Sequence, residues 1–297
     1  MGIAPVTVLL PCFNAESTVG RSLDSLLMQE MKDFVCIVLD NCSTDASAGI
    51  IDQKTKSDSR FLVLKNTQNM GVAHSFHRLI RLSDSDFTIF LAADDWMHPS
   101  CLSLLLDGLA RNPGAICAAP VTQRFRDDGF KMLSNGTSAI CAKTTQARMQ
   151  RYFSSLNDNS RFYGLYRTDV LKAGNIPLDF FAADLVLTCL TLRFGDHIEI
   201  GIHDGRSPLL FRELPISMRK YIPPSSSIFL ILRLFIAPFA AGTKTLCLML
   251  PKLQAALLLP RLIWLNFMLA FAVVRSFLGS SALLRRVYFS FLKSTHG

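Results

Sequence analysis

The chain has 297 residues, half of them apolar, with 31 Lys and Arg residues against 23 Asp and Glu residues. This composition excludes an intrinsically disordered chain, a collagen-like sequence and a disulfide-stabilised miniprotein. The length is sufficient for one large domain, or one domain with an appendage, and for a sizeable hydrophobic core.

The start of the chain has a β-α-β pattern. Residues 6–10 and 34–39 are short apolar runs, ended by Pro11 and Asp40, and such runs are typical of buried parallel strands. Between them, residues 17–31 carry apolar side chains at helical spacing, with Ser and Thr available as the N-cap. The pattern predicts a strand, a helix and a second strand.

The same pattern then repeats along the chain. We expect a helix over 43–56, a strand over 61–64, a helix over 71–82 and a strand over 87–91. Strands that alternate with helices at this rhythm indicate an α/β protein with a parallel sheet and right-handed crossovers. In such sheets ligands bind outside the carboxyl ends of the strands, so the residues that follow each strand are candidate site residues.

Polar residues follow all four of these predicted strands, at the same edge of the sheet. Each group taken alone is also explained as a turn or a helix cap, whereas the four groups together favour a binding site. The groups are Pro11 to Asn14, Asp40 to Ser43, Lys65 with Asn66, and Asp94 to Trp96.

The next part of the chain, to about residue 215, is less regular. Residues 115–142 indicate shorter strands, with more Gly and Asn. Beyond them we expect further elements that cover the first half of the chain and shape the side of the site where a second substrate, the acceptor, would bind. These are helices over 145–155, 168–173 and 184–192 and strands over 198–200 and 209–212.

Four segments, in chain order, carry a resemblance to a known family. They are VTVLLPCFNAESTVGRSLDSLLMQ, FVCIVLDNCSTDAS, NMGVA and FTIFLAADDWMHP, all within residues 6–109, and a weaker match continues to about residue 215. The sequence resembles the inverting family 2 glycosyltransferases of the GT-A fold. The resemblance implies a Rossmann-like, mostly parallel sheet flanked by helices, in a domain over 1–222. It also implies that a sugar is transferred with inversion from a nucleotide-diphosphate sugar.

The resemblance implies how the first two strand ends bind the nucleotide. Pro11, Phe13 and Asn14 match the family's P-x-[YF]-N motif, whose loop lies against the base and the ribose. Asp40 matches the carboxylate that accepts a hydrogen bond from a uracil-type base edge. A carboxylate that only accepts hydrogen bonds suits an imide N–H donor.

The resemblance also assigns the following two strand ends. Asn69 and Gly71 match the family's N-x-G, in which the glycine lets the backbone approach the nucleotide. Asp94 and Asp95 occupy the DxD-like position, which coordinates Mg²⁺ or Mn²⁺ across the two phosphates. A divalent cation on hard oxygen ligands suits a pyrophosphate leaving group, because the ion neutralises charge as the glycosidic bond breaks.

The sequence departs from the family pattern at two places. Ala92 stands where the commoner L-D-S-D-D string has its first Asp, and residues 75–77 replace the family's A-R-N, so that a usual Arg is missing. We interpret the site as a variant form, because related subfamilies resemble the A-A-x-D-D string. Two alternatives stay open: Asp95 only caps the helix after Trp96, or a degenerate domain binds nucleotide or partner proteins without catalysis.

Inverting transfer needs a general base on the acceptor hydroxyl. Asp184 resembles the family's catalytic Asp, which precedes an apolar helix; the alternative is a carboxylate that only stabilises the helix N-terminus. Arg212 follows where the family often carries a basic motif near the diphosphate, and its alternative is a surface salt bridge or a strand-end charge. Weaker candidates for the base are His77, His98 and Asp179.

The last part of the chain carries the whole formal excess of positive charge. Residues 221–297 contain eight basic residues and no acidic ones, and apart from the adjacent Arg285 and Arg286 the basic residues stand singly among Leu, Phe, Ile and Ala. Nucleic-acid-binding surfaces place Lys and Arg on a polar face, so we expect no nucleic-acid partner. Single basic residues among apolar ones favour an anionic membrane surface. An ordinary buried helical pair with a few solvated charges is the alternative.

The tail, residues 223–297, opens with a Pro- and Ser-rich linker over 223–227. We predict that the helices after this linker lie in the membrane interface. The tail's longest charge-free run, residues 262–274, is shorter than the ~20 residues that span a bilayer. Three prolines divide the tail into shorter helices. A tilted span over 262–284 is the alternative.

The remaining features concern the compartment. The eight cysteines are scattered without metal-ligand spacing, and we expect buried apolar residues in a reducing compartment. No signal-peptide pattern precedes the first predicted strand. We expect a cytoplasmic protein, peripheral on the inner face of the membrane, whose acceptor is a glycan or a lipid-linked molecule in cell-surface polysaccharide biosynthesis.

A nucleotidyltransferase is disfavoured, because residues 11–14 lack the Gly and Lys of its phosphate loop.

Overall fold

The computed structural model divides the chain into two compact units, residues 1–179 with 183–214 and residues 180–182 with 215–297. The described residues all belong to the first unit, and the predicted linker and membrane tail lie outside them. The structure describes residues 5–125, 131–134, 136–154, 159–174, 183–201 and 210–213.

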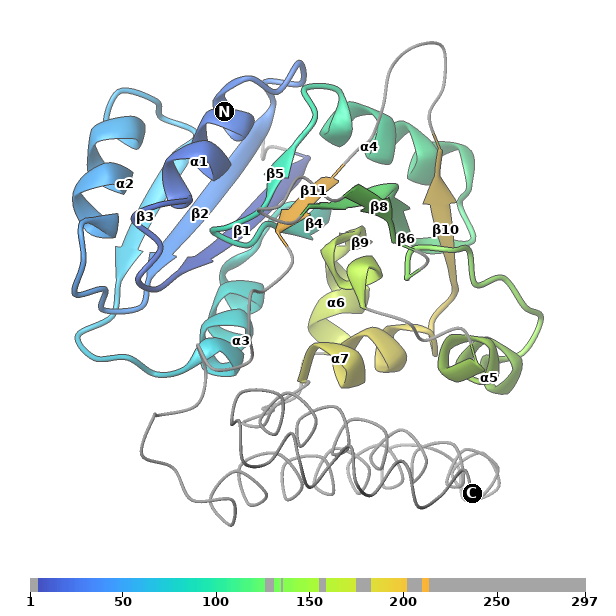
Figure 1. Cartoon of the computed structure of the whole chain (residues 1–297). Helices are drawn as coiled ribbons and strands as arrows, with labels where there is room; N and C mark the ends of the chain where they lie inside the picture. Colours follow the sequence, from blue (N-terminus) through green and yellow to red (C-terminus); the bar gives the residue numbers. More distant parts are fainter. Residues whose placement is uncertain are drawn as a thin grey trace, which may run out of the picture. The chain divides into compact units, whose positions relative to one another are not determined.

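The first half of the described chain alternates strands and helices as predicted (Figure 1). Each predicted strand and helix is present, with ends that differ by a few residues. The elements are β1 (Val6–Cys12), α1 (Val19–Leu27), β2 (Phe34–Asp40), α2 (Ser47–Thr55), β3 (Phe61–Lys65), α3 (Val72–Leu82), β4 (Phe87–Phe90), β5 (Trp96–Met97) and α4 (Cys101–Arg111).

The second half contains shorter elements, again near the predicted positions. A single turn of 3₁₀ helix, η1, precedes a three-residue strand that the sequence did not reveal. The elements are β6 (Ala115–Pro120), β7 (Thr122–Phe125), β8 (Lys131–Leu133), α5 (Thr145–Ser154), η1 (Ser160–Tyr163), β9 (Leu165–Arg167), α6 (Thr168–Gly174), α7 (Ala183–Thr191), β10 (Asp196–Ile200) and β11 (Leu210–Glu213).

Seven strands form the main sheet, in the order β10-β6-β9-β4-β1-β2-β3. The pairs β1–β2, β2–β3, β1–β4 and β10–β6 are parallel, whereas β9 runs antiparallel to both β4 and β6. The sheet is therefore mostly parallel. A second sheet has the order β5-β11-β7-β8, so β11 does not return to the main sheet.

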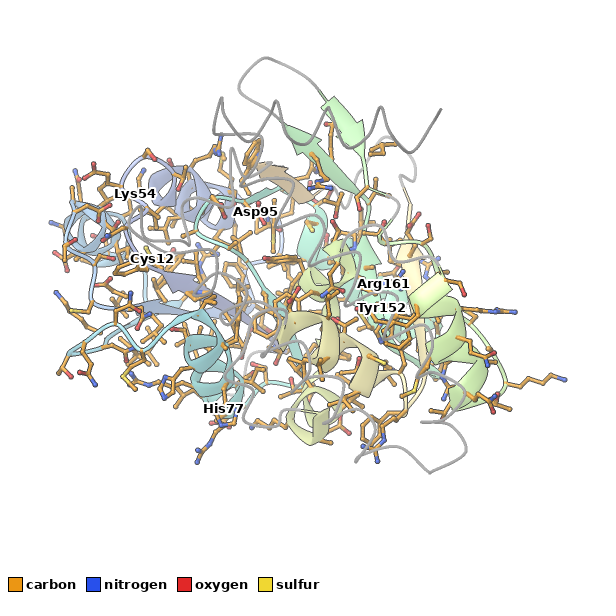
Figure 2. The ribbon with its side chains drawn as sticks, turned by 60° about the horizontal axis from the view of Figure 1, so that its bottom comes forward. Cys12, Lys54, His77, Asp95, Tyr152 and Arg161 are labelled. Carbon is orange, nitrogen blue, oxygen red and sulfur yellow. The ribbon has the colours of Figure 1, made fainter. Side chains whose placement is uncertain are left out.

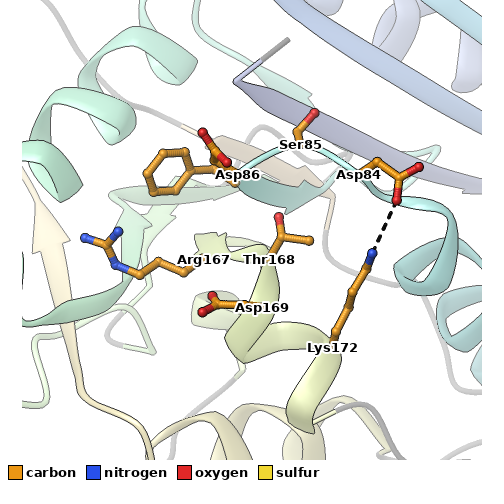
Figure 3. A pocket seen from close by; sticks show the side chains of 8 residues that line it. Asp84, Ser85, Asp86, Arg167, Thr168, Asp169 and Lys172 are labelled. Carbon is orange, nitrogen blue, oxygen red and sulfur yellow. Dashed lines mark hydrogen bonds and ion pairs between the residues drawn. The ribbon is translucent and has the colours of Figure 1, made fainter. Parts of the chain in front are cut away.

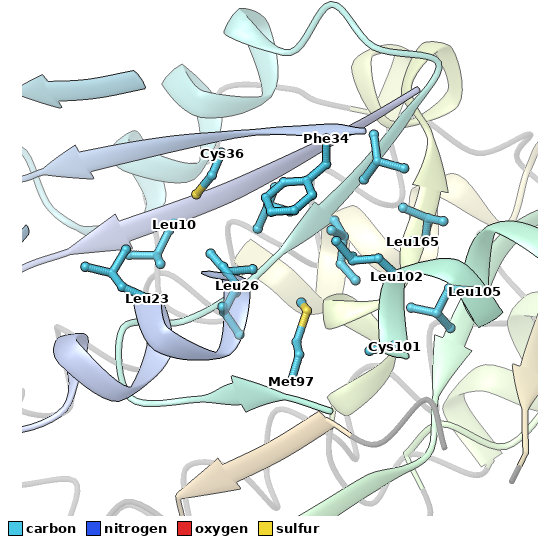
Figure 4. Close-up of a cluster of buried hydrophobic side chains, with 14 of the residues drawn as sticks. Leu10, Leu23, Leu26, Phe34, Cys36, Met97, Cys101, Leu102, Leu105 and Leu165 are labelled. Atoms are coloured by element: carbon cyan, nitrogen blue, oxygen red, sulfur yellow. The ribbon is translucent and has the colours of Figure 1, made fainter. Parts of the chain in front are cut away.

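Both faces of the main sheet are covered by helices, which explains the continuous apolar runs of its strands. In β1, Val8 and Leu10 face one core and Leu9 faces the other, and all three are fully buried. The first core contains residues from α1, α2 and α4, and the second contains residues from α3, α6 and α7 (Figure 1). Figure 4 shows the first core, in which Leu23 and Leu26 of α1 pack over the sheet.

The cysteines of the described residues are all free, and most of them are buried. Cys12, Cys36, Cys101, Cys117 and Cys189 lie in the interior, Cys42 is half-buried and Cys141 is exposed. Burial raises the pKa of the Cys12 thiol, and likewise that of Cys117, to about 12. These interior thiols therefore behave as small apolar side chains.

The described residues contain no helix that is both long enough and apolar enough to cross a membrane.

Candidate functional site

Parallel pairing brings the ends of neighbouring strands to one edge of the main sheet. The register aligns Cys12 of β1 with Asp40 of β2, and Asp40 with Lys65 of β3. Strand β4 runs parallel to β1 on its other side. The polar groups that follow these strands therefore meet at one edge, as predicted, and this edge carries the candidate site.

The loops that follow β1 and β2 are tied to each other through Asn14. Its Oδ1 accepts a hydrogen bond from the Thr44 backbone N–H at 2.9 Å, and its own backbone N–H donates to Ser43 Oγ at 3.1 Å. Asn14 has a φ of 46°, a left-handed conformation that Asn tolerates better than most residues. Asn14 therefore holds the loop in shape, and the side chain of the neighbouring Phe13 is 43% exposed.

Asp40 is a buried carboxylate of the site, with an exposed fraction of only 2%. Its Oδ1 accepts a hydrogen bond from the Ser43 backbone N–H at 3.0 Å. Its Oδ2 is buried and has no hydrogen-bond partner in the described part of the chain. Lys65 Nζ lies 3.8 Å from Oδ2, but this side chain is 62% exposed, so solvent screens the pair. A buried acceptor without a donor is costly, which suggests that a ligand supplies one.

Three asparagines fix the loop that follows β3. Asn41 Oδ1 accepts hydrogen bonds from Asn66 Nδ2 at 2.7 Å and from the Met70 backbone N–H at 3.0 Å. Asn41 Nδ2 donates to Asn69 Oδ1 at 2.7 Å, and the Gly71 backbone N–H donates to the same oxygen at 2.8 Å. Gly71 has a φ of 82°, a left-handed conformation that residues with a Cβ rarely adopt. Asn69 and Gly71 thus shape the loop beside Asp40. Asn41 and Asn66 belong to the predicted strand-end groups, and their role in holding this loop was not evident from the sequence.

The missing Arg of the family pattern has a structural explanation. Phe76 stands in its place on α3, and its ring packs edge-on against Phe90 of β4 at 5.2 Å and Phe162 of η1 at 5.0 Å between centroids. Arg78, two residues later, donates a hydrogen bond to Asn66 Oδ1. A guanidinium therefore still reaches the loop beside Asp40, from a position that the motif comparison did not consider.

Asp94 and Asp95 lie in the turn that follows β4. The Asp95 backbone N–H donates to the Ala92 carbonyl at 3.1 Å, which closes the turn. Arg21 of α1 donates to the Asp94 carbonyl oxygen at 3.2 Å, and its guanidinium stacks over the Trp96 ring at 3.6 Å from the ring centroid. Asp94 is half-buried, whereas Asp95 is 1% exposed. The turn that carries the two carboxylates is therefore held by hydrogen bonds to its backbone, and Asp94 is the carboxylate that solvent reaches.

The interpretation of Asp95 as a helix cap is wrong. Helix α4 begins at Cys101, and its N-cap is Ser100. The two residues that follow Asp95 form β5, which pairs with β11. His98, a weaker candidate for the base, has its Nδ1 2.9 Å from Ser100 Oγ, so it belongs to this helix start.

Asp184 lies in the first turn of α7. Asn159 Nδ2 donates to its Oδ2 at 2.8 Å, and Thr188 Oγ1 donates to its backbone carbonyl at 2.8 Å. Asn159 immediately precedes η1, which leads into β9 beside the carboxyl end of β4. The general-base candidate is thus tied to a segment that reaches the same edge of the sheet.

The other predicted residues are placed less directly. Arg212 lies on β11, one residue after Phe211. Because Phe211 pairs with Trp96 of β5, the backbone of Arg212 lies close to the strand that follows Asp95. His77 lies on α3 and is half-buried. Asp179 lies outside the described residues. Among the described residues, no group of three or more His, Cys, Asp or Glu side chains is arranged to hold a metal ion.

A pocket of about 540 Å³ lies elsewhere on the molecule (Figure 3). It is lined by the segment that precedes β4, with Asp84 and Asp86, and by the start of α6, with Asp169 and Lys172. Lys172 Nζ and Asp84 Oδ1 form an ion pair at 3.4 Å across it. Because this pocket adjoins the amino end of β4, it is separate from the strand-end site.

Comparison with known proteins decides the family. A sequence profile described as Glycosyl transferase family 2 matches residues 7–174, which is more than half of the chain. The chain belongs to glycosyl transferase family 2. The match includes β1 to β4 and therefore the strand ends described above, as the resemblance predicted.

This family 2 chain has the GT-A fold, as predicted. S. aureus TarS 1-349 in complex with UDP-GlcNAc superposes with a TM-score of 0.61, at 16% identity, over 84% of this chain and 69% of that chain. The mannosyltransferase PcManGT from Pyrobaculum calidifontis, in complex with GDP-Man and Mn²⁺, has a TM-score of 0.52, at 16% identity, over 93% of this chain and 88% of that chain. At these identities the likeness concerns the fold.

Curated relatives of this family 2 chain are similar over shorter stretches. The poly(ribitol-phosphate) beta-glucosyltransferase of Bacillus spizizenii is 28% identical over 100 residues, which are 33% of this chain and 16% of the relative. The chain spans about half, or less, of the length of the first curated relatives it matches.

Proposed function

We propose that this chain transfers a sugar, with inversion, from a nucleotide-diphosphate sugar to a glycan or lipid-linked acceptor in cell-surface polysaccharide biosynthesis. The observation that carries the donor assignment is Asp40, whose buried Oδ2 has no hydrogen-bond donor within the described residues. This oxygen suits the imide N–H of a uracil-type base, because a carboxylate only accepts hydrogen bonds. The exposed Phe13 ring, held by the loop of Pro11 and Asn14, would lie against the base.

A divalent cation, Mg²⁺ or Mn²⁺, is the second part of the proposal. Asp94 and Asp95 would provide hard oxygen ligands from one turn, and such ions commonly use one or two protein carboxylates together with substrate phosphates. The pair therefore fits an ion that is shared with a diphosphate. When bound, the ion would act as a Lewis acid on the leaving group. The PcManGT complex with Mn²⁺ supports this assignment through the common fold.

The remaining roles complete the proposed reaction. Asp184 takes the proton from the acceptor hydroxyl as the hydroxyl oxygen attacks the anomeric carbon, and the nucleoside diphosphate leaves from the opposite face. Asn69 and Gly71 shape the loop beside the nucleotide, and Arg212 is proposed to contact the diphosphate. A poly(ribitol-phosphate) glucosyltransferase among the relatives supports a cell-surface polymer as the acceptor class.

Changing Asp40 to Asn tests the donor assignment directly. The new amide presents an N–H where the carboxylate presented an acceptor, so UDP affinity is expected to fall about 10- to 100-fold, since hydrogen bonds to charged groups contribute roughly 1.5–3 kcal/mol. The affinity of the variant for CDP, whose ring N3 is an acceptor, is expected to rise relative to its affinity for UDP. Isothermal titration calorimetry with UDP, CDP and GDP measures both changes.

The matched control for this variant is Asp107→Asn. Asp107 forms an exposed ion pair with Arg111 on α4, and such surface pairs contribute little. UDP affinity is expected to stay at the wild-type value. Wild-type UDP affinity in Asp40→Asn would show that the base does not bind at this carboxylate.

The domain boundary and the membrane surface are tested by truncation. We propose that residues 1–222 form the transferase domain and that 223–297 attach it to the cytoplasmic face of the membrane, through apolar helices with single basic residues. A chain that ends after Pro224 is expected to move from the membrane pellet to the supernatant on ultracentrifugation. If the truncated chain still sediments with membranes, the tail is not the anchor.

Binding without catalysis is the alternative function, and the observation that speaks for it is the burial of Asp95, which is 1% exposed. Calorimetry of UDP binding with and without Mn²⁺ separates the two. A tightening with Mn²⁺, lost in Asp94→Asn, is expected for the transferase. Affinity that is independent of Mn²⁺, together with absent turnover, is expected for the binding domain.

A further inference from the structure

Asp184 is hydrogen-bonded to Asn159, which is in turn hydrogen-bonded to Tyr152, and both residues lie earlier in the chain. Asn159 Nδ2 donates to Asp184 Oδ2 at 2.8 Å. The hydroxyl of Tyr152, on α5, lies 2.9 Å from Asn159 Oδ1 and 3.2 Å from the Leu185 carbonyl oxygen. Tyr152 is 1% exposed, and Figure 2 shows it beside Arg161. None of these contacts involves the loops that hold the nucleotide candidates.

We propose that Asn159 and Tyr152 are positioning residues, which hold the Asp184 carboxylate in the orientation that accepts the proton of the acceptor hydroxyl. The inference rests on the proposed function, because it assigns a task to the surroundings of the proposed general base. It adds two residues to the site that no sequence motif indicates.

The direction of the hydrogen bonds explains why an amide and a phenol suit this task. The Tyr152 hydroxyl donates to Asn159 Oδ1, and this contact sets which end of the amide faces the carboxylate. The opposite amide orientation would place an oxygen against Asp184 Oδ2 and would be repulsive. An amide does not titrate, so the donor to the carboxylate persists at every pH at which the enzyme works.

The surroundings of Tyr152 keep its hydroxyl in place as a donor. Burial raises the pKa of the Tyr152 phenol well above its ordinary value, and the nearby Cys189 and Asp184 raise it further. The guanidinium of Arg161 lies 5.7 Å from the Tyr152 ring centroid, and its Nη2 donates to the Ser138 carbonyl oxygen at 2.8 Å. A buried, packed phenol cannot rotate freely, so the orientation of Asn159 is set before any acceptor arrives.

Positioning of this kind acts on turnover rather than on donor binding. A displacement of about 1 Å in a reacting group can cost about 100-fold in rate. Loss of the Tyr152 hydroxyl leaves the Asp184 carboxylate present but less well oriented. The expected result is a reduced kcat with unchanged affinity for the nucleoside diphosphate.

The test compares Tyr152→Phe and Asn159→Ala with the full-length wild type. Release of nucleoside diphosphate from UDP-GlcNAc, UDP-glucose and GDP-mannose is measured with Mn²⁺, with and without a membrane lipid extract as the acceptor source. Both variants are expected to lose about 10- to 100-fold in kcat. The Kd for UDP is expected to stay within twofold of the wild-type value.

Tyr166→Phe is the matched control. Tyr166 is also 1% exposed, and its hydroxyl donates to the Arg161 carbonyl oxygen at 2.9 Å. It is expected to keep wild-type kcat, although it loses a buried hydrogen bond of the same kind. A second comparison adds Tyr152→Phe to Asp184→Asn, in which no further loss of turnover is expected, because positioning has no effect once the base is absent.

The possible results separate the inference from the function on which it rests. If Asp184→Asn abolishes turnover while Tyr152→Phe and Asn159→Ala keep wild-type kcat, the positioning role is wrong and the proposed function stands. Equal losses of kcat in Tyr152→Phe and Tyr166→Phe would show a general packing effect and would also overturn it. A wild type that binds UDP with no turnover of any donor overturns both.

Discussion

Asp94→Asn is expected to lower kcat/KM for a sugar nucleotide about 1000-fold, and Asp95→Asn by a similar factor. A divalent ion contributes several kcal/mol of charge stabilisation at the leaving phosphates, and about 4 kcal/mol corresponds to 1000-fold in rate. Each substitution would remove one of the two proposed carboxylate ligands from the turn that follows β4. Nucleoside diphosphate release over a range of Mn²⁺ concentrations measures the effect.

The two variants are expected to differ in their dependence on the metal ion. Asp94 reaches solvent, so its loss is expected to raise the Mn²⁺ concentration needed for half-maximal turnover most strongly. Asp95 is buried, so its variant is also checked by thermal unfolding. Asp107→Asn serves as the control, because its carboxylate belongs to an exposed pair on α4. Wild-type turnover in both site variants would exclude these residues as metal ligands.

Asp184→Asn is expected to lower kcat by roughly 100- to 10,000-fold, the range for the loss of a general base. Asn has nearly the same shape but cannot accept the proton of the acceptor hydroxyl. UDP affinity is expected to remain at the wild-type value, because Asp184 lies outside the loops that follow β1, β2 and β3. A turnover assay measures kcat and calorimetry measures the Kd for UDP, both on the same preparation.

The other interpretation of Asp184, as a charge that stabilises a helix start, predicts a different result. In that case Asp184→Asn would cost roughly 0.3–1 kcal/mol of folding free energy and leave turnover unchanged. Asp169→Asn is the matched control, since Asp169 lies in the first turn of α6 and accepts a hydrogen bond from the Val170 backbone N–H. A similar small loss of stability in both variants, without loss of turnover, would rule out the general base.

Much of the candidate site could be predicted because it follows strands with a strong apolar pattern. Residues 34–39 are apolar without interruption, so the strand and its end at Asp40 were both evident. Parallel pairing then places successive strand ends at one edge by geometry alone. Strand β9, by contrast, has three residues and joins β4 to β6 in the antiparallel direction, which no periodicity could indicate.

The supporting residues could not be predicted from motifs. Asn41 bonds to Asn69 at a separation of 28 residues, and Asn159 bonds to Asp184 at a separation of 25. Arg21 reaches the Asp94 turn from 73 residues away. Such contacts leave no repeating signal in the sequence, because each depends on how loops at the ends of different elements meet.

The sequence by itself determined the α/β alternation, the strand-end carboxylates and the family, because hydrophobic periodicity and short motifs are local properties of the chain. Only the tertiary structure decided that Asn14 holds a loop, that Asp40 Oδ2 is a buried acceptor without a hydrogen-bond donor among the described residues, and that Tyr152, Asn159 and Asp184 are joined by hydrogen bonds. Burial and hydrogen-bond partners are set by residues that are distant along the chain. They exist only after the layers have packed.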